Sequence, residues 1–160
     1  MSKDLEKAQD YLGNKDLLKL PKTAFLASNT ISSETVLHCY DWATEMCRQG
    51  QCVVSGFSSK LEKDVLHFLL KGNQPIIMVL ARQMYKVVPT NLKEALEQNR
   101  LLIISTSQAV RQSRATALAR NRYVCEIADE IMLVGAAEGN SLFELTEQYK
   151  EKIVSPMSAI

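Results

Sequence analysis

The sequence lacks several features that mark particular classes of protein. No apolar run reaches the roughly 18 residues that a membrane span needs, and the first twenty residues mix acids and bases, unlike a signal peptide. The four cysteines include no C-x-x-C pair, so their spacing indicates neither a zinc site nor a disulfide framework. We therefore expect a soluble, cytoplasmic protein with buried, reduced thiols.

Neither sign of charge is in large excess. The chain has 19 Lys and Arg against 18 Asp and Glu, a formal net charge of +1, whereas dedicated nucleic-acid binders are usually more basic. Any contact with nucleic acid should therefore come from a local basic patch. The length of 160 residues fits one domain that buries a full core.

Short apolar runs alternate along the chain with segments of helical periodicity. The runs are continuously apolar, which is typical of parallel strands buried on both faces by helices. Strands joined through helices by short loops predict a Rossmann-like, doubly wound α/β fold, with a mainly parallel sheet of five or six strands. Strands are expected at 24–27, 52–55, 76–80, 101–104 and 131–134, with helices at 34–48, 61–71, 92–98, 115–128 and 142–149.

The two ends of the chain carry weaker patterns. Residues 4–20 have the spacing of a short amphipathic helix, interrupted near Gly13 and closed by Pro21, because proline fixes φ and lacks an N–H. We interpret residues 1–21 as an N-terminal helical extension and 22–160 as the Rossmann-like domain. Residues 152–154 are the candidate for the sixth strand.

Small and polar residues follow each predicted strand. Ligands of an open parallel sheet bind outside the carboxyl ends of its strands, so these residues should converge on one rim. Small residues let backbone N–H groups approach an anion, and helix N-termini favour negative charge, which indicates phosphate or a nucleotide. The alternative is that they only form turns and helix caps. The candidates are Ser28, Asn29, Ser55, Gly56, Ser58, Arg82, Ser105, Gly139, Asn140 and Ser141.

An arginine-rich stretch without acids runs from residue 98 to residue 125. The planar guanidinium fork suits phosphate oxygens, and the missing counter-charges favour anion binding over a merely solvated helix face. We assign Arg111, Arg114 and Arg120 to phosphate, together with Lys60 from an earlier loop.

Arg120, Asn121 and Arg122 stand next to each other on a predicted helix, where the two arginines point about 200° apart. We expect Arg120 to face the ligand and Asn121 to bridge to a strand-end loop. Arg122 should have a structural role, because Glu126 lies one turn on and can pair with it. Loss of Arg120 should then weaken binding and leave stability little changed.

No catalytic set emerges from the sequence. His38 and His67 fall on predicted helices without a positioned nucleophile, and neither a G-x-G-x-x-G nor a Walker-type loop is present. We therefore predict no resident metal or cofactor. The alternatives to a binding protein are an enzyme that acts on a nucleotide, with Glu62 or Glu144 as acid–base, and a regulatory subunit with a vestigial site.

Several segments resemble the DNA-processing protein A (Smf/DprA) family. Residues 53–62, VVSGFSSKLE, are similar to its VVSG-[small]-ARGID signature, and residues 117–128 are similar to its RNR-containing segment. The chain looks most like the short, single-domain members. The resemblance implies a Rossmann-like fold, binding of single-stranded DNA, recombinase loading and self-association, for instance as a homodimer.

The chain also departs from that family pattern. Residues 28–30 read Ser-Asn-Thr where members usually carry a G-S-R turn. In the signature, Ser59 and Lys60 replace the arginine and glycine, and Glu62 replaces the aspartate. The P-G-G-x-G-T-x-x-E motif of the related phosphoribohydrolases is absent, which argues against hydrolase activity.

Overall fold

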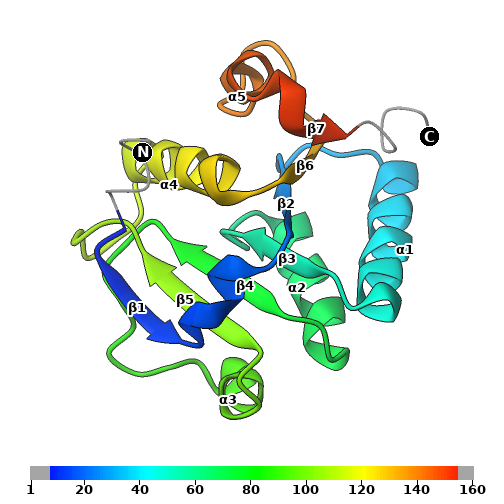
Figure 1. Ribbon diagram of the computed structural model, residues 1–160. Helices are drawn as coiled ribbons and strands as arrows, with labels where there is room; N and C mark the ends of the chain where they lie inside the picture. Colours follow the sequence, from blue (N-terminus) through cyan, green and yellow to red (C-terminus); the bar gives the residue numbers. More distant parts are fainter. Residues whose placement is uncertain (1–7, 155–160) are drawn as a thin grey trace.

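Within residues 8–154, seven strands form a single sheet through the centre of the molecule (Figure 1). The computed structural model describes residues 8–154. The strands are β1 (Asp10–Gly13), β2 (Lys22–Ala27), β3 (Cys52–Ser55), β4 (Ile76–Leu80), β5 (Leu101–Ser105), β6 (Glu130–Val134) and β7 (Ile153–Val154). Their order across the sheet is β1-β5-β4-β3-β2-β6-β7. All neighbouring pairs are parallel except β1 and β5, which are antiparallel.

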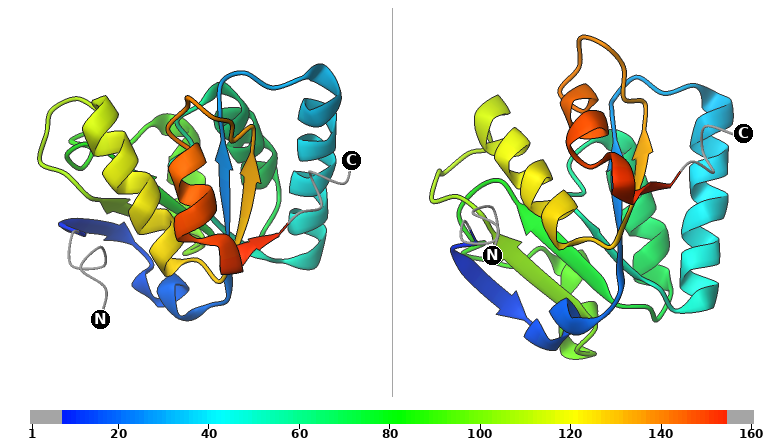
Figure 2. Two further views of the ribbon diagram at one scale, coloured as in Figure 1. Left: turned by 90° about the horizontal axis from the view of Figure 1, so that it is seen from above. Right: turned by 45° about the horizontal axis from the view of Figure 1, so that its top comes forward.

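Helices cover both faces of this sheet (Figure 2). Successive side chains of a strand point to opposite faces, so Phe25 packs with the residues of one core cluster and Leu26 with those of the other. Helices α1, α2 and α3 enclose the first cluster, while α4 and α5 enclose the second. Their bounds are α1 (Ser33–Gln49), α2 (Lys60–Lys71), α3 (Thr90–Glu97), α4 (Arg114–Ile127) and α5 (Phe143–Gln148).

The doubly wound α/β fold predicted from the sequence is therefore confirmed, and each of its five expected strands and five expected helices is present within two residues of its expected bounds. The sheet has seven strands where five or six were expected. The candidate strand at the C-terminal end is β7, which pairs with β6. Residues 155–160 lie outside the described part of the chain.

The expected N-terminal helix is wrong for residues 10–13, which form strand β1. Asp10 to Gly13 pair with Ser105 to Leu102 and so cover the outer edge of β5. Without β1, the edge of β5 would have unpaired backbone N–H and C=O groups. The hydrogen bonds between β1 and β5 satisfy these groups and override the weak local helix pattern. Only the short 3-10 helix Lys15–Lys19 follows, and residues 4–7 lie outside the described range.

All four cysteines are free thiols. Cys39, Cys52 and Cys125 are buried, while Cys47 is half-buried. Burial raises the pKa of the Cys39 thiol to about 11 and that of Cys52 and Cys125 to about 12, so these thiols stay protonated at neutral pH. None of the helices within residues 8–154 combines the length and apolar character needed to cross a bilayer.

The order of the strands reverses between β2 and β6. From β2 the chain proceeds through β3 and β4 to β5 in one direction, and α4 then carries it back to β6 on the other side of β2. The loops after β2 and β6 diverge at such a reversal and leave a crevice at the carboxyl ends of the strands. This crevice is where the fold is expected to hold a ligand.

The close contact between β1 and β5 at Gly13 predicts that replacing this glycine with alanine strongly destabilises the protein. Gly13 has a φ of +110°, and a Cβ added there would lie 2.3 Å from the carbonyl oxygen of Leu101. Gly13→Ala should lower the free energy of unfolding by roughly 2–4 kcal/mol, through backbone strain and this overlap. Urea denaturation measures the loss.

Gly50→Ala is the matched control, because Gly50 has a φ of +69° and open space around the added Cβ. It should lose only about 1 kcal/mol. Equal losses for the two variants would contradict the close packing of β1 against β5.

Candidate functional site

A pocket of about 360 Å³ lies at the carboxyl ends of β2, β3 and β6, where the strand order reverses. Its walls are residues 28–30 after β2, residues 58–59 after β3 and residues 140–142 in the loop after β6. Glu62 from α2 and the pair Arg120 and Asn121 from α4 complete it. The volume is at the lower end of the range of small-molecule sites, roughly 300–1,000 Å³.

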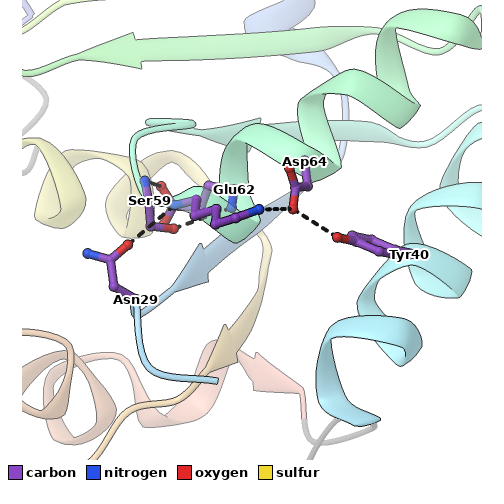
Figure 3. A network of polar contacts seen from close by, with 6 residues as sticks. Asn29, Tyr40, Ser59, Glu62 and Asp64 are labelled. Carbon is purple, nitrogen blue, oxygen red and sulfur yellow. Dashed lines mark hydrogen bonds and ion pairs between the residues drawn. The ribbon is translucent and has the colours of Figure 1, made fainter. Parts of the chain in front are cut away.

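The Glu62 carboxylate ties the end of β2 to the start of α2. The residue is 4% exposed. Its Oε2 accepts the Ala27 N–H at 2.9 Å, and its Oε1 accepts the N–H groups of Ser58 at 2.8 Å and Ser59 at 3.1 Å. The Ser59 hydroxyl accepts the Glu62 N–H in return, which makes a capping box (Figure 3). A carboxylate is stable here because the N-terminus of a helix favours negative charge.

Arg120 brings a buried positive charge to the same pocket. It is 3% exposed, and it donates from Nε to the Asn121 side-chain oxygen at 2.8 Å and from Nη1 to the Val79 carbonyl at 3.3 Å. Within residues 8–154 its guanidinium has no ion pair and no further hydrogen bond. Burial lowers the pKa of Arg120, while the charge of Glu62 raises it. Donors therefore remain for an anion that enters the pocket.

Gly56 makes room for this guanidinium. A Cβ added at Gly56 would lie 2.4 Å from the Cζ and Nη1 atoms of Arg120. Any side chain there would displace the arginine. The glycine of the sequence signature is therefore explained by the close approach of α4 to the loop after β3.

A second polar network adjoins the pocket on the side of α1 (Figure 3). The side-chain oxygen of Asn29 accepts the Lys60 N–H at 3.3 Å, and the Lys60 ammonium lies 3.4 Å from the Asp64 carboxylate. Tyr40 donates its hydroxyl to the same carboxylate at 2.8 Å, and this hydrogen bond raises the pKa of the tyrosine. Lys60 therefore already has a counter-charge.

The structure brings seven of the sequence-predicted residues together around the pocket. Asn140 among them also closes its own loop, because its amide donates to the Gly135 carbonyl and accepts the Leu142 N–H. Gly56 lies behind the pocket, against Arg120. The seven residues are Ser28, Asn29, Ser58, Arg120, Asn121, Asn140 and Ser141.

Three other candidates lie outside the pocket and hold the backbone of strand-end loops. The Ser55 hydroxyl accepts the Phe57 N–H. The Ser105 hydroxyl contacts the carbonyl oxygens of Arg82 and Ser107. Arg82 donates to the Gln83 carbonyl and lies over the Tyr85 ring. Arg82 and Ser105 belong to the ends of β4 and β5, on the far side of β3 from the pocket.

A second hollow, of about 340 Å³, adjoins the pocket through Asn140 and Ser141 and runs between α4 and α5. Arg114, Gly139 and the partly exposed Phe143 line it. Arg111 is exposed on the loop before α4. The side chain of Gln112, from the same loop, donates to the Ser58 hydroxyl at 3.0 Å and so links this loop to the pocket wall.

The carboxylate partner of Arg122 is Glu144 from α5, at 3.5 Å, and not Glu126 as the sequence suggested. The reason is tertiary, because α5 packs beside α4 and brings a carboxylate to the arginine from outside the helix. Arg120 is buried and holds the Asn121 side chain and the Val79 carbonyl, and the small effect of its loss on stability stays a prediction.

Sequence reasoning missed the structural role of Glu62, which it treated only as an alternative acid–base group. The signal was present as the spacing of Ser59 and Glu62, since S-x-x-E marks a capping box at the start of a helix. Thr30 and Leu142 also line the pocket without having been candidates. Among residues 8–154, no three His, Cys, Asp or Glu side chains gather to hold a metal ion.

Comparison with known proteins identifies relatives of the chain. A family model described as DNA recombination-mediator protein A matches residues 9–146. Among solved structures, DNA processing protein A from Streptococcus pneumoniae superposes with a TM-score of 0.72 and 20% identity, over 95% of this chain and 56% of that one. The Helicobacter pylori protein, described in terms of its single-stranded DNA binding mode, gives 0.71 and 22%, over 96% and 76%. No curated protein sequence matches the chain.

The contacts of Glu62 predict that it anchors the fold as well as the pocket. Glu62→Ala leaves the N–H groups of Ala27, Ser58 and Ser59 without an acceptor, so the free energy of unfolding should fall by about 3 kcal/mol or more. Thermal and urea unfolding measure the change. Glu97→Ala, an exposed acid on α3, should stay within about 0.5 kcal/mol of the unsubstituted protein. Similar losses in both would rule out the anchoring role.

Proposed function

Since this chain belongs to the DNA recombination-mediator protein A family, we propose that it is a non-enzymatic protein that binds single-stranded DNA or a nucleotide by phosphate. The site is the pocket at the carboxyl ends of β2, β3 and β6. We propose the cytoplasm as the compartment in which it acts. The family membership supports a role in DNA processing, and the similar Helicobacter pylori protein is described as binding single-stranded DNA.

The observation that carries the proposal is the unpaired guanidinium of Arg120. A buried charge without a counter-ion is expensive, and proteins keep such groups chiefly where a ligand supplies the opposite charge. Arg120 is 3% exposed, lines the pocket and keeps unused donors, and its own contacts are to neutral oxygens. A phosphate oxygen accepts charge-assisted hydrogen bonds from such a donor set.

The surface beside the pocket suits the continuation of a strand. The hollow between α4 and α5 adjoins the pocket and carries Arg114, while Arg111 stands exposed on the loop before α4. Within residues 8–154, neither arginine forms an ion pair. We propose that they contact further phosphates of a bound strand, which is a sequence-independent mode of binding.

Removal of the Arg120 charge should weaken binding without unfolding the protein. Arg120→Met keeps much of the buried volume, so the free energy of unfolding should change by less than about 2 kcal/mol. The affinity for a fluorescein-labelled oligothymidylate should fall at least about tenfold, measured by fluorescence anisotropy, because a charge-assisted hydrogen bond is lost.

Arg122→Met is the control on the same helix. Its side chain pairs with Glu144 and is outside the pocket. Affinity should stay within about twofold, and stability should fall by less than about 1 kcal/mol. Equal affinity losses in the two variants would exclude Arg120 as the phosphate ligand.

Binding through phosphate also predicts a defined response to salt. The affinity for single strands should fall as salt rises, with a slope in log–log form of about 0.7 for each phosphate neutralised. Arg111→Ala combined with Arg114→Ala should reduce that slope by about 1.4, and by the same amount for oligonucleotides of different sequence. Anisotropy titrations at several salt concentrations give the slopes.

A control variant removes the same amount of charge from the amino ends of the strands. Lys19→Ala with Arg48→Ala loses two exposed cations that pair with Asp16 and Glu45. Its slope should match that of the unsubstituted protein. A reduced slope in this control, or a sequence-dependent effect of the first variant, would count against the proposed surface.

A further inference from the structure

The pocket contains one charged group of each sign. Among residues 8–154, Glu62 and Arg120 are the only charged side chains that line it, and both are buried. The other polar groups of the wall, such as Ser28, Asn29 and Asn121, are neutral. Of these two charged groups, Arg120 attracts a negative charge on a ligand and Glu62 repels it.

The start of α2 does not offer the anion site that helix N-termini often provide. The N–H groups of Ser58 and Ser59 are held by the Glu62 carboxylate, and that of Lys60 by the Asn29 side chain. The ammonium of Lys60 is paired with Asp64. Glu62 thus occupies the place where a phosphate would otherwise bind, and a ligand phosphate is left with the α4 side of the pocket.

We infer that Glu62 makes the pocket selective for a singly charged phosphodiester over a doubly charged terminal phosphate. This inference rests on the proposed function and names the ligand class within it. One negative charge on the ligand balances Arg120. A second charge has no partner in the pocket and lies near a buried carboxylate, where repulsion is strong because little water screens it.

Two probes that differ by one charge test the inference on the unsubstituted protein. Thymidine 5′-monophosphate and its methyl ester compete against a fluorescein-labelled oligothymidylate, and anisotropy reports the displacement. At pH 8 the ester should compete about tenfold better. At pH 5.5 the monophosphate is largely singly charged, because its second pKa is about 6, so the difference should nearly vanish. A control competition with thymidine, which has no phosphate, should displace little.

The methyl ester serves as the reference that makes the pH comparison a test of the charge on the monophosphate. Glu62 from α2 and Arg120 from α4 are the charged groups that line the pocket, and the loops after β2 and β6 contribute none. The adjoining hollows add Lys60 and Asp64 on one side and Arg114 and Glu144 on the other. The charge of the methyl ester does not change between pH 5.5 and pH 8, so the ester corrects for any effect of pH on the protein.

Glu62→Gln tests the residue itself, since the amide keeps the shape and one acceptor oxygen but not the charge. The advantage of the ester at pH 8 should fall from about tenfold to less than about threefold. Glu97→Gln, an exposed carboxylate on α3 that lines neither the pocket nor the adjoining hollow, should leave the advantage unchanged. If Glu62→Gln does not fold, the pH series on the unsubstituted protein decides alone.

The possible failures separate the two proposals. An oligothymidylate that does not bind overturns the proposed function and this inference with it. If the oligonucleotide binds, the inference alone is overturned by equal competition at pH 8, by an advantage of the ester that persists at pH 5.5, by no competition from either probe, or by an unchanged advantage in folded Glu62→Gln.

Discussion

A single carboxylate determines how the candidate site is built. Glu62 accepts N–H groups from the end of β2 and from the loop after β3, so it joins two neighbouring strands to the start of α2. Buried N–H groups need acceptors, and here the carboxylate supplies them for Ala27, Ser58 and Ser59. Because the carboxylate meets this need from within the chain, the positive end of α2 is already neutralised when a ligand arrives.

Arg120 therefore provides the positive charge of the pocket. With the start of α2 occupied, the remaining source of positive charge in the pocket is a guanidinium on the opposite wall, buried against a glycine that leaves it space. Such an unpaired charge lowers the stability of the free protein, which is common at sites built for a ligand. In the proposed function this guanidinium is the anion contact, and Asn121 and the Val79 carbonyl hold it in place before a ligand binds.

The departures from the family signature take on a physical meaning in this arrangement. Ser59, at the position of the signature arginine, caps α2 and forms the capping box with Glu62. Lys60 is turned to the side of the pocket and pairs with Asp64. The positive charge that the signature would place on α2 is therefore absent from the pocket, and the cations available to a ligand are on α4 and the loop before it.

Much of the fold follows from the sequence alone, because continuous apolar runs separated by helical periodicity leave few arrangements other than a parallel sheet covered on both faces. The same reasoning found the loops of the pocket, since residues such as Ser28 and Ser141 follow strands whose carboxyl ends meet. Local patterns could not reveal β1, whose four residues are held as a strand only by β5.

Tertiary structure alone decided which strand-end residues share a pocket. Ser105 and Arg82 have the same sequence context as Ser28, yet the strand order puts them beyond β3. The packing of α4 against other elements also decided that Arg122 pairs with Glu144 from another helix and that Arg120 is buried against Gly56. Sequence spacing reports neighbours along one element, whereas burial and pairing depend on which elements pack together, and that is fixed only when the whole sheet has formed.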